Sequence, residues 1–170
     1  MHLHAADLVR LVLIGLGATL VMDLWLWTLG RLGVRTLDFA MLGRWLGYAR
    51  RGRYAHAAIA KAEPMRGERA LGWVIHYAVG LALAATLIVL KGRGWLHAPT
   101  VGAALAFGLA TVVLPLLVVQ PALGAGFASA RTATPLRNVF KSFVTHGVFG
   151  AGLYLSAAAL AWVWPGSAFS

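Results

Sequence analysis

The chain contains four apolar stretches, each long enough to cross a lipid bilayer. They cover residues 8–29, 70–90, 100–123 and 142–164. The hydrocarbon core is about 30 Å thick and a helix rises about 1.5 Å per residue, so a spanning helix needs about 20 apolar residues. Only 12% of the residues are charged, well below the share of about 25% in soluble domains, and the charges cluster between the stretches. The pattern predicts an all-α polytopic membrane protein, with four transmembrane helices in one bundle and residues 1–170 forming one domain.

The basic residues are distributed unevenly between the two sides of this predicted bundle. The net charge is +10, and most of the Lys and Arg residues lie in segments 30–69 and 124–141. The opposite side carries only Arg10, Lys91 and Arg93. Because basic loops are retained in the cytoplasm, we expect an inner-membrane protein with both termini in the periplasm. This topology explains the positive charge without a nucleic-acid partner.

The long basic loop 30–69 has features of a membrane-surface segment. Thr36 or Asp38 is a suitable N-cap for a short helix over residues 39–48, which has an apolar face. Such a helix lies in the head-group region of a bilayer, and neighbouring basic residues attract anionic lipid. The residues expected at the lipid surface are Trp45, Arg50, Arg51 and Arg53. A solvated loop that only sets the topology explains the same charges.

Each apolar stretch carries one strongly polar residue near its predicted cytoplasmic end. These residues are Asp23, His76, Gln120 and His146. An unpaired polar group in hydrocarbon costs several kcal/mol, so four of them rarely arise by chance. Counting the helical rise from the inner ends places all four at depths of roughly 5–9 Å. We therefore expect one polar layer that binds a ligand or protons.

Small residues accompany these polar groups on the same helix faces. Asp23, for example, lies on a stripe with Gly15, Thr19 and Trp27 at steps of four residues. Small residues let membrane helices approach closely, so these faces are expected to point into the bundle. Within the layer we expect Asp23 to accept a hydrogen bond from a histidine, which would fix the tautomer of that histidine.

Several functions fit such a layer. It can be a network that fixes the register of the helices, or a transport site or proton relay that uses titration of Asp23 and the histidines. His76, His146 and Asp23 suit a divalent metal ion, and the two histidines alone suit axial ligation of a haem. Ser142 shares a face with His146, but nothing else indicates a nucleophile, so we do not expect an enzyme of a known class. The absence of cysteine excludes thiolate metal sites and disulfides.

The leading interpretation is a ligand-binding or transport-associated membrane protein. The alternatives are a metal- or haem-binding redox or assembly component, and a structural subunit of a membrane complex. Faces rich in Gly and Ala also permit a homo-oligomer. The sequence identifies neither the ligand nor a cofactor.

A short internal similarity links the second and fourth stretches. His76 and His146 are each followed four residues later by glycine, Gly80 and Gly150, at corresponding positions of their stretches. This pattern is typical of a duplicated helical hairpin, with the two copies related by a pseudo-two-fold axis along the membrane normal.

Several motifs together resemble one known family. They are residues 15–23 (GLGATLVMD), 37–38 with 43–45, 67–73 (GERALGW) with 76–77, 120–124 (QPALG), and 145–146 with 149–150. This combination resembles the bacterial membrane-protein family catalogued as domain of unknown function 2938, from about residue 13 to residue 155. The resemblance implies a small four-helix protein of the bacterial inner membrane, and it implies no activity.

Overall fold

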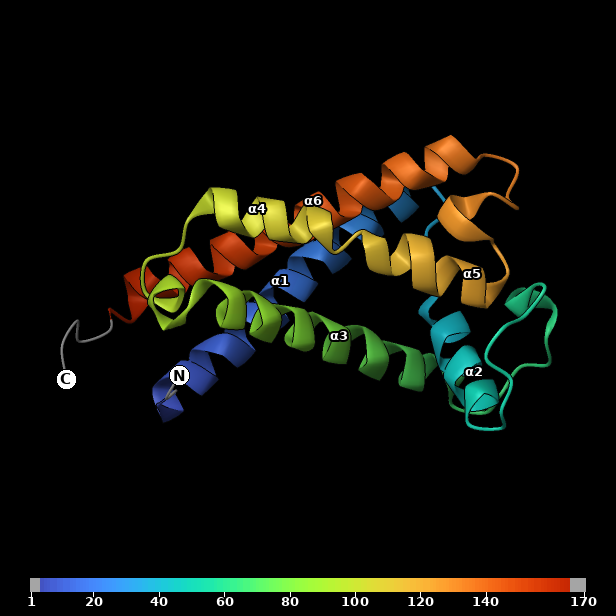
Figure 1. Cartoon of the computed structure of the whole chain (residues 1–170), viewed down its shortest axis with the longest axis horizontal. Helices are drawn as coiled ribbons and strands as arrows, with labels where there is room; N and C mark the ends of the chain where they lie inside the picture. Colours follow the sequence, from blue (N-terminus) through green and yellow to red (C-terminus); the bar gives the residue numbers. More distant parts are fainter. Residues whose placement is uncertain (1–3, 166–170) are drawn as a thin grey trace. The chain divides into compact units, whose positions relative to one another are not determined.

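The computed structural model describes residues 4–165, which contain helices and no β-strand (Figure 1). The α-helices are α1 (Ala5–Arg31), α2 (Phe39–Ala49), α3 (Glu68–Lys91), α4 (Val101–Ala110), α5 (Gln120–Leu123) and α6 (Pro135–Val163). Short helical turns lie between them: η1 (Ile59–Lys61), η2 (Arg93–Leu96), the π-helical η3 (Pro115–Val119) and η4 (Phe127–Ser129). The predicted all-α class is confirmed. The outermost residues, 1–3 and 166–170, lie outside the described part of the chain.

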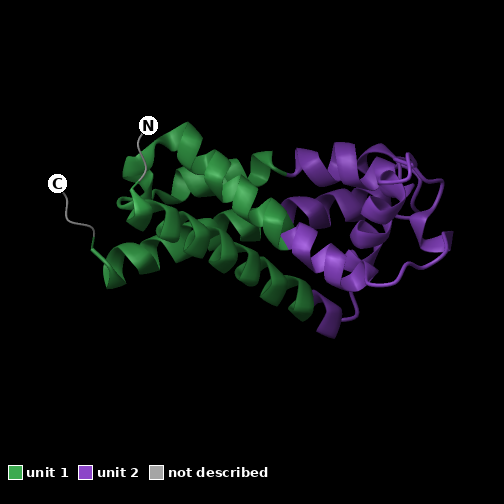
Figure 2. Ribbon diagram, turned by 90° about the horizontal axis from the view of Figure 1, so that it is seen from below, with its two compact units in different colours: residues 1–28, 77–111, 145–170 green, residues 29–76, 112–144 purple. Residues whose placement is uncertain are grey.

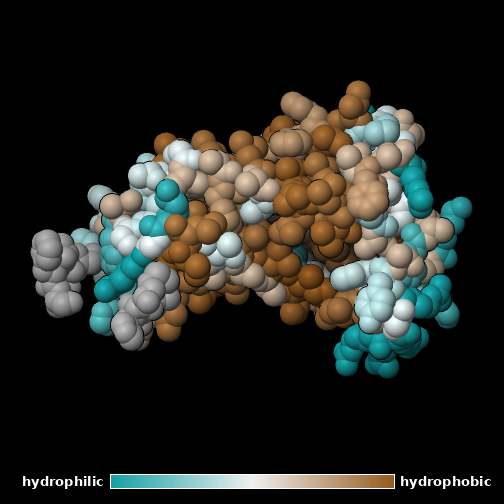
Figure 3. All heavy atoms as spheres, viewed as in Figure 1, coloured by the Kyte–Doolittle hydropathy of each residue, from teal (hydrophilic) through white to brown (hydrophobic). Residues whose placement is uncertain are grey.

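Four helical segments of the described chain are long and apolar enough to cross a membrane. They are Ala5–Arg31, Glu68–Lys91, Val101–Leu123 and Pro135–Val163. In the face drawn in Figure 3, apolar side chains cover much of the exposed helical surface, and hydrophilic side chains gather at the loops. Water disfavours so much exposed apolar surface, whereas lipid does not. These helices indicate a multi-pass membrane protein.

Helices α1, α3 and α6 each begin before the corresponding apolar stretch. The largest difference is in α6, which begins at Pro135 although the apolar stretch begins at residue 142. Proline suits the first position of a helix because its missing N–H would have no partner there. Arg137, Asn138 and Lys141 then make the first two turns polar. Hydropathy marks the part of a helix that lies in hydrocarbon, whereas helical hydrogen bonding continues into the polar region.

Two compact units divide the chain (Figure 2). Unit 1 consists of residues 1–28, 77–111 and 145–170, and unit 2 of residues 29–76 and 112–144. The core of unit 1 is a cluster of apolar side chains that are almost completely buried. Ile14, Ala18, Leu87 and Leu153 belong to this cluster.

Glycines let the helices of unit 1 touch backbone to backbone. A Cβ atom on Gly108 of α4 would lie 2.5 Å from the Cα atom of Gly150 in α6. A Cβ atom on Gly80 of α3 would overlap the hydroxyl group of Thr19 in α1. These contacts show that the stripes of small residues are helix-packing surfaces, as expected from their spacing.

In unit 2, α2 packs closely against the first turns of α3. A Cβ atom on Gly43 would overlap the Glu68 carbonyl oxygen, and one on Gly72 would overlap the Phe39 carbonyl oxygen. The helix predicted over residues 39–48 is therefore present as α2. One of its two expected caps is confirmed, because Asp38 accepts a hydrogen bond from the Ala40 backbone N–H at 2.9 Å.

Candidate functional site

Polar side chains from α1, α3, α6 and Thr111, the residue after α4, lie at the same level along the helix axes of unit 1. These side chains belong to Asp23, Trp25, Tyr77, Thr111, Thr145 and His146. The Tyr77 hydroxyl donates to Asp23 Oδ2 at 2.8 Å, and Trp25 Nε1 donates to Thr145 Oγ1 at 3.2 Å. Trp25 is two residues from Asp23, and Thr145 is next to His146. The bond between Trp25 and Thr145 therefore places Asp23 and His146 within about one helical turn of the same level along the helix axes.

The hydrogen bonds of His146 define its tautomer. Its Nδ1 atom lies 2.8 Å from Thr111 Oγ1, and the same hydroxyl donates its single proton to the Gly108 carbonyl oxygen at 2.6 Å. The Thr111 oxygen must then accept from the histidine, so Nδ1 carries the proton of the neutral ring. Its Nε2 atom is left with a lone pair that can accept a proton or bind a ligand. Thr111 is therefore a positioning residue for His146.

We expect Thr111→Val to change the tautomer of His146. The substitution keeps the shape of the side chain and removes the oxygen that accepts from His146 Nδ1. That hydrogen bond contributes about 1 kcal/mol, so its loss should change the ratio of the two tautomers about fivefold. Nitrogen NMR of histidine-labelled protein measures that ratio, with His146→Gln to assign the signal. Thr111→Ser retains the hydroxyl and should keep the Nδ1–H form. An unchanged ratio in Thr111→Val would contradict the assignment.

His76 lies in unit 2, against aromatic side chains. Its ring stacks on Phe39, with the ring centroids 4.0 Å apart and the planes inclined by 22°. Trp73, one turn earlier in α3, meets the His76 ring edge-on at a centroid distance of 5.8 Å. Phe39 is the first residue of α2, so the close packing of α2 on α3 positions this ring stack.

Gln120, also in unit 2, connects α5 to the loop that follows it. Its Oε1 atom accepts a hydrogen bond from Ser129 Oγ at 3.0 Å, and its Nε2 atom donates to Ser142 Oγ at 3.4 Å. Ala128 and Ser129 have positive φ angles of 48° and 61°, a backbone conformation that non-glycine residues seldom adopt. The bond from Gln120 to buried Ser129 helps to hold this strained turn in place.

The structure therefore brings Asp23 and His146 to one height of unit 1 and places His76 and Gln120 in unit 2. A common layer of all four residues and a histidine bond to Asp23 remain predictions. One expectation is wrong, since Trp27 is 63% exposed although it was expected on the inward stripe of Asp23. Steps of four residues overshoot the 3.6-residue repeat by about 40° each, so the stripe turns away from the bundle within three steps.

Among residues 4–165, no group of three or more His, Asp or Glu side chains lies close enough to hold a metal ion together.

The residues expected at the lipid surface lie in and after α2. Trp45 Nε1 donates to the Tyr54 carbonyl oxygen at 2.7 Å, and the Arg53 guanidinium lies 5.1 Å from the centre of the Tyr48 ring. Arg50 and Arg51 are exposed.

A buried charged cluster at the other end of unit 1 was not expected from the sequence. Asp7 is 1% exposed, forms an ion pair with Arg93 Nε at 2.7 Å, and accepts a hydrogen bond from His97 Nε2 at 3.0 Å. Arg10 is equally buried, donates to the Trp164 carbonyl oxygen and lies over the Trp164 ring. One feature of the sequence could have indicated this cluster. Asp7 is one of only five acidic residues, and it stands at the start of an apolar stretch.

His56, in the basic loop that follows α2, is a second buried polar residue. It is 9% exposed, and neither of its ring nitrogens has a hydrogen-bond partner in the described part of the chain. Its ring meets the Tyr48 ring edge-on at 5.2 Å, and its backbone N–H donates to the Ala122 carbonyl oxygen at 3.1 Å. His56 therefore attaches the long basic loop to α5.

These features define a class: a polytopic α-helical membrane protein that carries polar and titratable groups within its spans. A profile of the family described as "Protein of unknown function (DUF2938)" matches residues 12–160. The chain belongs to this DUF2938 family, which confirms the resemblance inferred from its motifs. No curated protein and no solved structure matches the chain.

Proposed function

We propose that this protein lies in the bacterial inner membrane with both termini in the periplasm, and that Asp23 and His146 bind protons during transport. The observation that supports the proposal most is their arrangement in unit 1. Each of these half-buried titratable side chains is oriented by a hydroxyl group, Tyr77 for Asp23 and Thr111 for His146. Ionisable groups within spans are costly and typically mark proton or solute pathways.

The core of unit 1 limits the route that protons can take. Asp7 and Asp23 are 16 residues apart on α1, or about 24 Å along the helix. Between them lie Ile14 and Ala18, which are at most 1% exposed and belong to the apolar cluster. Such a packed apolar layer leaves no room for a chain of water molecules. We therefore propose that Asp23 exchanges protons with the cytoplasmic side, and that passage to the periplasm requires the helices to move.

Proton flux in vesicles tests this function. The full-length protein is reconstituted with a trapped pH-sensitive dye, and a potassium gradient with valinomycin imposes a membrane potential. We expect the wild type to acidify the lumen, and Asp23→Asn to reduce the flux to that of protein-free vesicles, since the amide cannot carry a proton. Asp38→Asn is a matched control, because asparagine also caps a helix well. Equal flux in the wild type and Asp23→Asn would contradict the proposal.

A second candidate function is the binding of a metal ion or a haem at His146 in unit 1. The tautomer of His146 favours it, because histidine ligands commonly donate one ring N–H to a neighbouring group and bind the metal through the other nitrogen. Elemental analysis of the purified protein beside a His146→Ala variant distinguishes the two functions. Stoichiometric iron, zinc or copper in the wild type alone would support the metal site.

A further inference from the structure

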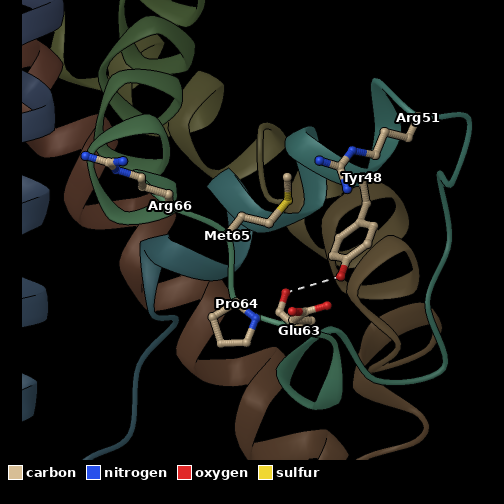
Figure 4. A pocket seen from close by; sticks show the side chains of 6 residues that line it. All are labelled: Tyr48, Arg51, Glu63, Pro64, Met65 and Arg66. Atoms are coloured by element: carbon tan, nitrogen blue, oxygen red, sulfur yellow. Dashed lines mark hydrogen bonds between the residues drawn. The ribbon is translucent and has the colours of Figure 1, made fainter.

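We propose that a pocket in unit 2 binds the head group of a phospholipid that carries both a phosphate and an ammonium group. The pocket has a volume of about 380 Å³ (Figure 4). It is lined by Tyr48, Arg51, Glu63, Pro64, Met65 and Arg66. These residues belong to the end of α2 and to the segment that leads into α3.

Hydrogen bonds hold the walls of this pocket in place. The Tyr48 hydroxyl donates to the Glu63 carbonyl oxygen at 3.2 Å, which connects α2 to the opposite wall. The Met65 backbone N–H donates to Glu68 Oε2 at 2.8 Å, and Glu68 is itself paired with Arg44 at 2.7 Å. A pocket that is formed before binding loses less entropy when a ligand enters.

The charges of the pocket suit a ligand with two opposite charges. Figure 4 shows Arg51 beside the ring of Tyr48 and Glu63 near the hydroxyl end of that ring, whereas Arg66 points away from both. Within the described residues, the side chains of Arg51 and Glu63 make no hydrogen bond or ion pair. A guanidinium group binds phosphate oxygens through paired N–H donors, and a carboxylate accepts hydrogen bonds from an ammonium group. A phosphoethanolamine head group provides both partners.

The position of the pocket along α3 favours a bilayer lipid over a soluble compound. Met65 and Arg66 lie just before Glu68, the first residue of a membrane span. Residues that immediately flank a span lie in the head-group region. A lipid bound here can place its phosphate and amine in the pocket while its acyl chains remain beside the span.

Native mass spectrometry of the full-length protein tests the proposal. The probes are phosphatidylethanolamine and phosphatidylcholine, whose ammonium group has no N–H to donate. One charge-assisted hydrogen bond gives about a tenfold preference for the ethanolamine lipid in the wild type. Glu63→Gln should remove this preference. Arg51→Gln should weaken the binding of both lipids about tenfold, because both carry the phosphate.

Arg69→Gln is the matched control, because Arg69 is exposed in the first turn of α3 and does not line the pocket. It should change lipid affinity by about twofold or less, as expected for a screened surface charge. The proposal is overturned if the wild type does not distinguish the two lipids, or if Arg69→Gln weakens binding as much as Arg51→Gln. Binding of soluble phosphoethanolamine as tight as that of the lipid would also overturn it.

Discussion

Replacing Glu68 with glutamine is expected to lower the free energy of unfolding by about 3 kcal/mol. Arg44 forms a two-point ion pair with Glu68, with N–O distances of 2.7 and 2.8 Å. The side chains are only 11% and 15% exposed, so water screens the pair weakly. The substitution leaves the Arg44 charge without its partner in this partly dry site, which costs more than the pair itself contributes.

Arg44 also holds the loop that leads into α3. Its Nη1 atom donates to the Ile59 and Ala62 carbonyl oxygens at 3.2 and 2.9 Å. The hydrogen bonds with Glu68 raise the pKa of the Arg44 guanidinium above its ordinary value, so the pair remains charged at any physiological pH. The loss of Glu68 should therefore loosen the 59–65 segment as well as α2.

Thermal and denaturant unfolding in detergent, followed by circular dichroism, measures this effect. Glu63→Gln is the matched control, since this exposed carboxylate has no partner in the described structure, and it should change stability by about 0.5 kcal/mol or less. A double-variant cycle with Arg44→Met isolates the coupling between the two side chains. If Glu68→Gln were as stable as Glu63→Gln, the ion pair would not hold the loop.

The long helices and α2 could be predicted from the sequence because they depend on local patterns. Hydropathy over about 20 residues defines the spans, and Asp38 followed by an apolar face defines the start of α2. Helix ends were less accurate, as Pro135 shows, because polar turns continue a helix beyond the hydrocarbon.

Contacts between residues far apart in the chain could not be predicted in this way. Asp7 and His97 are 90 positions apart, and only the folded helices bring them together. Thr111 is an ordinary hydroxyl residue in the sequence, yet it orients His146 from a position 35 residues away. The sequence identified Asp23 and His146 as unusual for their surroundings, but it did not identify Tyr77 and Thr111 as their partners.

The second large effect expected is the complete loss of one proton-binding event in Asp23→Asn. Infrared spectroscopy detects the C=O stretch of a protonated carboxyl group, and the chain has only five carboxyl side chains to assign. Asp7 and Glu68 are ion-paired and Asp38 caps α2, so these three groups have roles in the fold. The remaining carboxyl group, that of Glu63, is exposed, and Glu63→Gln assigns its band.

An infrared pH titration of the reconstituted protein shows directly whether Asp23 binds protons. We predict a carboxyl band that disappears in Asp23→Asn and persists in Asp38→Asn. In Tyr77→Phe the band should persist at a shifted frequency, because the phenol that donates to Asp23 is removed. A wild-type spectrum whose carboxyl bands are all retained in Asp23→Asn would show that Asp23 does not bind protons and has no role in proton transport.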